Sequence, residues 1–401
     1  MRKSMRYHFK PRIMTTAIAL SFIGFASLAH AGPSADRKTF SPAATFDVMA
    51  GNGSAVAEIV DFAAHGKELV YTDSDMQEIG FVDIEEPAYP RGLGTVGVGG
   101  EPTSLAVLGD LVLVAVNTSA SFKKPSGQLV IIHRITRTIV AEHHLGGQPD
   151  SIALAPDHKR AVIVLENERD EDLDGGFIPQ EPTGKVLVVK LTGPPKSWKI
   201  KDVDLSEVAA SAFAGSDLEP EFVDINEENK AVISFQENNH LAIIDIVTRK
   251  VINHFPAGEV SLEDIDTTED DLITLDSTLK KRREPDAVTW IDHDSFATAN
   301  EGDYEDKNGE EGGSRGFTIF NQSGDIEFES NASFEHILVQ AGHYNEGRSE
   351  NKGVEPEAVE FGIFGKGKSR KALLFVGSER SNAVGVYEMV NGEPKFVQLL
   401  P

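Results

Sequence analysis

Apolar and polar residues alternate along most of this chain in short runs, and polar turns separate one run from the next. Three successive runs, for example, occupy residues 222–225, 231–235 and 241–246. Alternation with a period of two indicates strands that are buried on one side, and closely spaced turn residues indicate antiparallel pairing. The pattern therefore predicts groups of short antiparallel strands.

A short phrase with a central proline begins five of these groups. The copies are Glu101-Pro102-Thr103, Gln148-Pro149-Asp150, Glu219-Pro220-Glu221, Glu284-Pro285-Asp286 and Glu355-Pro356-Glu357. A proline has no N–H to donate, so it is tolerated where a strand begins. The phrase thus marks the first strand of each group.

The spacing of the phrase predicts the fold class. Successive prolines lie 47, 71, 65 and 71 residues apart, whereas one four-stranded propeller blade needs roughly 40–50 residues. The longer intervals hold insertions of about twenty residues, in the loops where propellers carry functional groups. An earlier unit (residues 57–84) lacks the phrase but keeps the strands. We therefore predict an all-β fold, a β-propeller of four-stranded blades with six visible units.

Residues 1–31 have the features of a secretory signal peptide. Five basic residues and no acidic ones precede an apolar stretch (residues 13–28), and Ala29-His30-Ala31 forms a cleavage site. The alternative is an uncleaved anchor, but the stretch is short for a membrane span. We expect cleavage, no membrane span afterwards, and a secreted or periplasmic protein that is free or associated with the cell surface.

The charge limits the class of partner. The chain has 64 acidic and 38 basic residues, and cleavage would move its formal charge from −26 to −31. Such a surface repels nucleic acid and attracts cations or a basic small-molecule ligand, although it can also serve solubility alone. The oligomeric state is left open. With no cysteine, stability must come from sheet packing instead of disulfides.

Residues 170–181 match the calcium-loop template D-x-D-x-D-G-x5-E. Ca²⁺ takes six to eight oxygen ligands, which alternate carboxylates in a tight loop can supply. The predicted ligands are Asp170, Asp172, Asp174, Gly176 (through its carbonyl) and Glu181. Pro179 and the strand-like residues after the loop argue against a helical EF-hand, and a solvated acidic loop is the alternative.

A second group of carboxylates follows from the repeat. Four copies place an acidic residue directly after the proline, namely Asp150, Glu221, Asp286 and Glu357. First strands line the channel of a propeller, so these side chains should gather at one mouth and repel one another unless a cation or an arginine neutralises them. They would then form a cation or basic-ligand site. We favour the alternative that each accepts hydrogen bonds from N–H groups of its own turn.

Two further polar loops suit metal-assisted phosphate chemistry, with Arg315 after one and Arg348 in the other. We favour the alternative that both are solvated turns, because loops need no function to be polar. An H-E-x-x-H motif is absent from the sequence.

Four segments resemble the choice-of-anchor I propellers: residues 217–246 (DLEPEFVDINEENKAVISFQENNHLAIIDI), 283–305, 353–362 and 373–389. That group includes mesenchyme-specific cell-surface glycoproteins and the propeller part of some atypical secreted alkaline phosphatases. The resemblance implies seven blades, export, and links to calcium or phosphate. Bacterial relatives often continue into a domain resembling esterase-like phytases. The chain stops at Pro401, so the propeller of residues 32–401 either lacks its last blade or closes with six.

These observations together favour an exported acidic propeller that acts as a calcium-binding recognition or scaffold module. The alternative is a metal-dependent phosphoesterase, alkaline phosphatase-like or phytase-like, in which Arg315 or Arg348 clamps phosphate.

Overall fold

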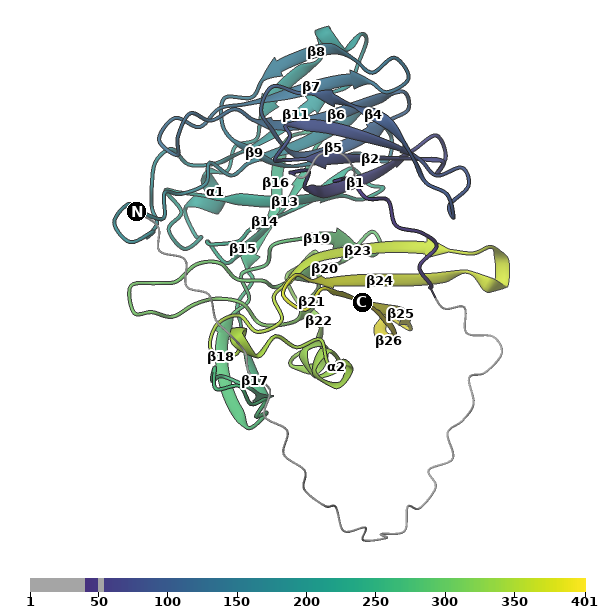
Figure 1. Ribbon diagram of the computed structural model, residues 1–401. Coiled ribbons are helices and arrows are strands. Elements are labelled where there is room, and N and C mark those ends of the chain that lie inside the picture. Colours follow the sequence, from purple (N-terminus) through teal and green to yellow (C-terminus); the bar gives the residue numbers. More distant parts are fainter. Residues whose placement is uncertain (1–39, 50–53) are drawn as a thin grey trace, which may run out of the picture. The chain divides into compact units, whose positions relative to one another are not determined.

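The computed structural model describes residues 40–49 and 54–401 (Figure 1), so the predicted signal peptide lies outside the described residues. Twenty-four of the 26 strands in the described residues form six four-stranded antiparallel sheets. This confirms the predicted all-β propeller. The six blades agree with the six units counted in the sequence, and they are one fewer than the seven blades that the family resemblance implied. No helix in the described part of the chain is long and apolar enough to cross a membrane.

The first three blades follow the chain order, each as a meander of four strands. Blade 1 consists of β1 (Ala57–Ala63), β2 (Glu68–Asp73), β3 (Glu78–Asp83) and β4 (Arg91–Gly97). Blade 2 consists of β5 (Glu101–Leu108), β6 (Leu111–Asn117), β7 (Gly127–His133) and β8 (Thr138–His144). Blade 3 consists of β9 (Pro149–Leu154), β10 (Arg160–Leu165), β11 (Lys185–Lys190) and β12 (Lys199–Asp202).

The last three blades have the same topology. Blade 4 consists of β13 (Pro220–Ile225), β14 (Lys230–Phe235), β15 (His240–Asp245) and β16 (Lys250–Pro256). Blade 5 consists of β19 (Val288–Trp290), β20 (Ser295–Ala299), β21 (Phe317–Asn321) and β22 (Ile326–Glu329). Blade 6 consists of β23 (Pro356–Phe364), β24 (Lys371–Ser378), β25 (Ala383–Val390) and β26 (Glu393–Leu400).

The insertions lie in loops, as predicted. The hairpin of β17 (Glu259–Ile265) and β18 (Ser277–Arg282) separates blades 4 and 5. The helices are α1 (Ser206–Ala209), α2 (Ser333–Ala341) and the 3₁₀ turns η1 (Pro195–Ser197), η2 (Glu346–Arg348) and η3 (Gly367–Ser369). Two loops without regular strands or helices, residues 166–184 and 300–316, connect the second and third strands of blades 3 and 5.

The first strand of each blade packs beside the first strands of its neighbours. β5 lies against β1 and β9, β13 lies against β9 and β19, and β19 lies against β23. In Figure 1 the sheets follow one another in the colour order of the chain, from the purple strands of blade 1 to the yellow strands of blade 6. Pro149, Pro220 and Pro356 each open their first strand, so the residue after the proline recurs at the same end of successive strands.

Apolar side chains and partly buried carboxylates join neighbouring blades. Five apolar clusters fill the five junctions from blade 1–blade 2 to blade 5–blade 6. Two junctions also have a carboxylate that accepts an N–H from the next first strand. Asp61 Oδ2 accepts the Val107 N–H at 2.9 Å, and Asp224 Oδ2 accepts the Trp290 N–H at 2.7 Å.

Blades 1 and 6 each have an apolar face that no described residues cover fully. On β1, Val60 and Phe62 are 59% and 65% exposed, whereas Ile59 and Ala63 pack toward blade 2. Side chains alternate between the two faces of a strand, so the face of β1 away from blade 2 is open. On blade 6, Phe40 covers part of the corresponding face by stacking edge-on against Phe364 and Phe375. No apolar cluster of the described residues joins these two blades.

We therefore expect the purified protein to bind an apolar dye such as ANS and to self-associate at high concentration, because exposed apolar strand faces favour both. Phe62→Ser should reduce both properties. Ile135→Ser is the matched control, since Ile135 is 59% exposed in a turn of blade 2. Equal effects of the two substitutions, measured by dye fluorescence and light scattering, would contradict the open face.

Candidate metal centre

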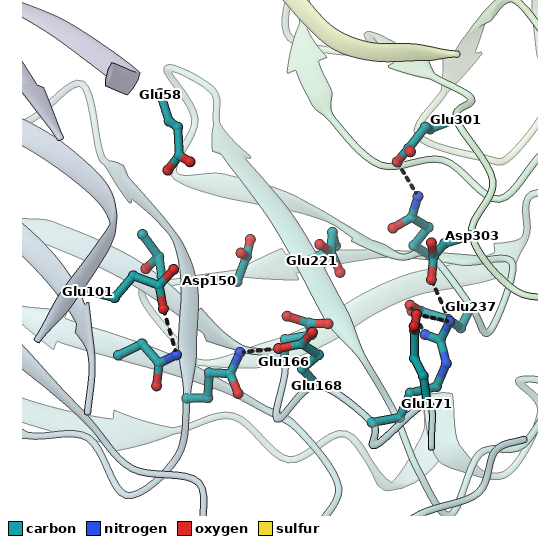
Figure 2. Close-up of a pocket in the computed structure, with 15 residues that line it drawn as sticks. Glu58, Glu101, Asp150, Glu166, Glu168, Glu171, Glu221, Glu237, Glu301 and Asp303 are labelled. Atoms are coloured by element: carbon teal, nitrogen blue, oxygen red, sulfur yellow. Dashed lines mark hydrogen bonds and ion pairs between the residues drawn. The ribbon is translucent and has the colours of Figure 1, made fainter. Parts of the chain in front are cut away.

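A cavity of about 400 Å³ lies where the first strands of several blades begin and their second strands end (Figure 2). We call it the axial cavity. Fifteen residues line it, and the ten that Figure 2 labels are all aspartate or glutamate. The only basic residue of the lining is Arg169. The cavity is therefore strongly acidic, and its lining comes from blades 1 to 5.

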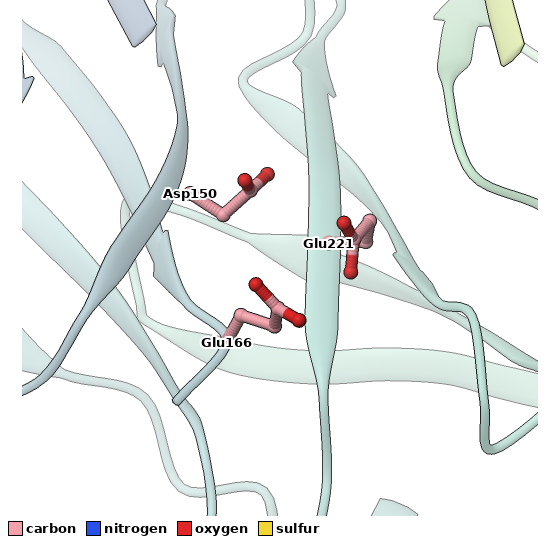
Figure 3. A group of neighbouring side chains, drawn as sticks. All are labelled: Asp150, Glu166 and Glu221. Carbon is pink, nitrogen blue, oxygen red and sulfur yellow. The ribbon is translucent and has the colours of Figure 1, made fainter. Parts of the chain in front are cut away.

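Three of these carboxylates converge. Asp150 lies on β9, Glu221 lies on β13, and Glu166 directly follows β10. β9 packs beside β13, and Leu165 pairs with Pro149 across β9 and β10, so Glu166 lies next to Asp150. One oxygen from each of the three residues lies within 4.8 Å of the others (Figure 3). The trio of Asp150, Glu166 and Glu221 is below called the carboxylate trio.

The charges of the trio have no compensation from hydrogen-bond donors among the described residues. Burial raises the pKa of Asp150 to about 7, and repulsion from Glu168 and Glu237 adds to the shift. Burial, followed by repulsion from other carboxylates, also raises the pKa values of Glu166 and Glu221 well above their ordinary range. Glu166 is only 9% exposed, and Glu221 Oε2 is buried without a partner.

The three carboxylates would repel one another strongly if all of them were ionised. Two unit charges about 4.8 Å apart repel by about 3 kcal/mol at an effective dielectric constant of about 20. Three charges therefore cannot coexist there without protons or a cation. Two oxygens bound to one Ca²⁺ at about 2.4 Å are at most about 4.8 Å apart, so the observed spacing suits a hard divalent ion.

The favoured sequence interpretation, in which each carboxylate after the proline accepts N–H groups of its own turn, is wrong for Asp150 and Glu221. Glu284, the residue before the proline in the fourth copy, instead accepts backbone N–H groups, and these belong to a loop about twenty residues further along the chain. Glu284 Oε2 accepts the Asp303 and Tyr304 N–H groups at 3.1 and 3.0 Å, and its Oε1 accepts Arg282 Nε at 2.6 Å. The residue after the proline instead faces its counterparts.

The remaining two predicted channel carboxylates lie outside the lining of the axial cavity. Burial raises the pKa of Asp286 well above its ordinary range, and repulsion from Glu301, Asp150 and Glu357 contributes. Asp286 therefore belongs to the same crowded group of acids. Glu357 keeps an exposed side chain, and partial desolvation followed by repulsion from Glu301 raises its pKa.

A second acidic group, made of Glu301, Glu355 and Glu379, has equally close oxygens but is neutralised. Glu355 accepts Arg348 Nε at 2.6 Å and Arg380 Nε at 2.9 Å. Lys352 Nζ lies 3.1 Å from Glu301 Oε1. Basic side chains thus already occupy the place that a cation would take, which leaves the carboxylate trio as the better cation site.

Arg169 does not neutralise the trio because other carboxylates bind it. Its Nη1 donates to Glu237 Oε1 at 2.7 Å and its Nη2 to Asp303 Oδ2 at 2.5 Å, and the side chain is 7% exposed. This ion pair joins the loop of residues 166–184 to blade 4 and to the loop of residues 300–316. It therefore fixes the position of the chain segment that carries Glu166.

The predicted calcium loop has the expected turn but not a converged ligand set. Gly175 has a φ of 79°, in the left-handed region that the turn requires. The two groups of close acidic oxygens in the described residues contain neither Asp170, Asp172, Asp174 nor Glu181. Gln180 closes the loop through two hydrogen bonds to the backbone of Asp170. Calcium binding by this loop, including the Gly176 carbonyl, stays a prediction.

The sequence analysis did not identify Glu166 as a site residue, and it considered Arg315 as a phosphate ligand although this side chain is buried. The missed signal is positional, since polar residues at or just after the end of the second strand recur at the mouth, as Asn117 and Gln236 also do. Arg315 cannot clamp phosphate from a loop surface. It is fully buried, and it donates to Asp266 O at 2.7 Å and pairs with Glu335 at 3.3 Å. Arg348 is paired with Glu355.

The raised pKa of Asp150 predicts how stability depends on pH. A carboxyl whose pKa rises on folding contributes stability below its unfolded value near 4, and this is lost as the pH rises through about 7. In the presence of a chelator, the thermal midpoint should therefore fall between about pH 5 and pH 8. Asp150→Asn should flatten this decrease, whereas the exposed control Glu142→Gln should not. A midpoint that does not fall would contradict the uncompensated cluster.

Comparisons with known proteins agree with the fold. The family model of the choice-of-anchor I domain matches residues 58–312 and 310–392. No curated protein sequence matches the chain. Among solved structures, the RRP9 WD40 repeats align with a TM-score of 0.54 and 8% identity, covering 86% of this chain and 81% of that one.

A second similar structure is hydrazine synthase of Kuenenia stuttgartiensis, with a TM-score of 0.50 and 15% identity over 82% of this chain and 76% of that one. At such identities the solved structures show a shared propeller fold only. The two matched segments of the family model together span most of the described residues. The chain belongs to the choice-of-anchor I domain family.

Proposed function

We propose that this protein is an exported propeller that binds Ca²⁺ at the mouth of its channel and serves as a recognition or scaffold module. The observation that carries the proposal is the carboxylate trio, in which one oxygen from each of one buried and two partly buried acids lies within 4.8 Å of the others, without hydrogen-bond donors among the described residues. Asp150, Glu166 and Glu221 would hold the ion. Bound Ca²⁺ would supply positive charge that neutralises the trio.

The chemistry of the donors favours Ca²⁺ over other metals. All three donors are hard carboxylate oxygens, whereas zinc and copper sites generally use histidine or cysteine. Mg²⁺ demands a near-ideal octahedron at shorter distances, and Ca²⁺ accepts irregular shells of six to eight oxygens. Glu168 and Glu237 also line the cavity, so they are within the region from which further oxygens could come. Export supports the proposal because extracellular fluids supply Ca²⁺ at concentrations that weak sites can use.

Calcium titration calorimetry on chelator-treated protein tests the proposal. We expect one Ca²⁺ to bind, and Glu166→Gln to weaken binding by at least about 100-fold, because even indirect partners of metal ligands contribute about 10–100-fold. Glu142→Gln is the control, since Glu142 is exposed on β8. Mg²⁺ should bind more weakly than Ca²⁺.

The double variant Asp172→Asn, Asp174→Asn separates the trio from the predicted calcium loop. If this variant loses binding while Glu166→Gln keeps it, the loop is the calcium site and the proposal for the trio fails. The same samples should be assayed for hydrolysis of p-nitrophenyl phosphate. Metal-dependent turnover that is lost in Glu166→Gln would favour the phosphoesterase alternative over a binding module.

A further inference from the structure

A second cavity of about 370 Å³ adjoins the axial cavity. We call it the side cavity. It lies between the loop that joins β6 to β7 in blade 2 and the loop that joins β10 to β11 in blade 3. Glu168 and Arg169 line both cavities, so the two spaces adjoin at these residues. Their sizes are typical of sites for small organic molecules or for one or two amino-acid side chains.

The two cavities differ in chemistry. Four apolar residues, namely Phe122, Leu173, Phe177 and Pro179, line the side cavity together with polar groups. Phe122 is 41% exposed at the surface of its loop. An aromatic side chain that stays exposed beside a strongly acidic cavity marks a place where an apolar group can bind. A ligand that spans both cavities would therefore have one charged end and one apolar end.

Two buried carboxylates that line the axial cavity indicate that the charged end of the ligand is positive. Glu166 is 9% exposed and has no hydrogen-bond donor among the described residues. Glu237 is 3% exposed, and its Oε2 is buried without a partner although Arg169 binds its Oε1. Unpartnered buried carboxylate oxygens are costly, so a positively charged group of a ligand in the axial cavity would stabilise both residues.

A single Ca²⁺ does not balance the negative charge of the axial cavity. It would supply two positive charges against ten acidic lining residues, of which Arg169 already binds Glu237 and Asp303. Glu168 lies at the junction with the side cavity, and its carboxylate is exposed and accepts only a hydrogen bond from Gln148 among the described residues. It is thus placed to bind a second cation whose remainder extends toward Phe122.

We propose that the two cavities together bind an organic cation, a primary ammonium or guanidinium group joined to an apolar body. The charged group lies in the axial cavity beside Glu168, and the apolar body lies in the side cavity against Phe122, Leu173 and Phe177. This inference rests on the proposed function, because it identifies the partner that the same channel mouth recognises. A free alkylamine and a lysine or arginine next to an apolar residue in a peptide share this chemistry.

Titration calorimetry with three related probes tests the inference. 4-Phenylbutylamine has both groups, butylamine has only the cation, and 4-phenylbutanol has only the apolar body. In saturating Ca²⁺ we expect 4-phenylbutylamine to bind about tenfold or more tightly than either of the others, because burying an aromatic ring is worth more than the 1.4 kcal/mol that corresponds to a factor of ten. Equal affinities for 4-phenylbutylamine and butylamine would overturn it.

Two variants with matched controls locate the site. Phe122→Ala should reduce the affinity for 4-phenylbutylamine about tenfold and leave that for butylamine unchanged. Phe213→Ala is its control, since Phe213 is 50% exposed and lines neither cavity. Glu168→Gln should weaken both amines and leave 4-phenylbutanol unchanged, whereas Glu142→Gln should affect none of them. No effect of Phe122→Ala would also overturn the proposal.

Calcium titrations on the same samples separate this inference from the proposed function. Phe122→Ala should leave Ca²⁺ binding intact. If Ca²⁺ binds and the amine does not, only the present inference fails; if the amine binds in a Phe122-dependent way and Ca²⁺ does not, only the calcium proposal fails. Comparing acetyl-Gly-Lys-Phe-Gly-amide with 4-phenylbutylamine distinguishes the two sources. Tighter binding of the peptide indicates a polypeptide partner, and tighter binding of the amine indicates a free small molecule.

Discussion

The packing of each first strand beside the first strands of its neighbours is the constraint on which the candidate site depends. Because β9 lies against β13 and pairs with β10, the residues at the ends of these strands meet. In β9, β13 and β23 a proline opens the first strand and fixes which residue comes next at that end. The phrase that repeats in the sequence therefore brings acidic side chains together at one end of neighbouring strands.

Converging carboxylates form a candidate cation site only where no basic side chain neutralises their charge. The acidic group around Glu355 has Arg348, Arg380 and the nearby Lys352, whereas the carboxylate trio has no basic partner among the described residues. Arg169 is the nearest arginine in the lining, and Glu237 and Asp303 bind it. Desolvation and repulsion then favour either protonation or a bound cation. This difference in partners, more than the number of carboxylates, distinguishes the two clusters.

The inserted loops add the features that would make the site selective. The loop of residues 166–184 contributes Glu166, Glu168 and Arg169 to the axial cavity and Phe177 to the adjoining side cavity. A rigid set of blades thus holds a loop that combines charge with apolar surface. By contrast, the uncovered faces of blades 1 and 6 are part of the scaffold itself, and their exposed residues, such as Phe62, lie on a strand.

The sequence by itself determined the strand pattern, the six blades and the recurrence of an acidic residue after the proline, because strand alternation and a repeated phrase are local properties. It also placed Asp150 and Glu221 at one mouth. Only the tertiary structure decided that Glu166 joins them, that Arg315 is buried against Glu335, and that Glu355 rather than the trio receives the arginines. The physical reason is that burial and charge pairing depend on loops far apart in the chain, whose meeting no periodicity encodes.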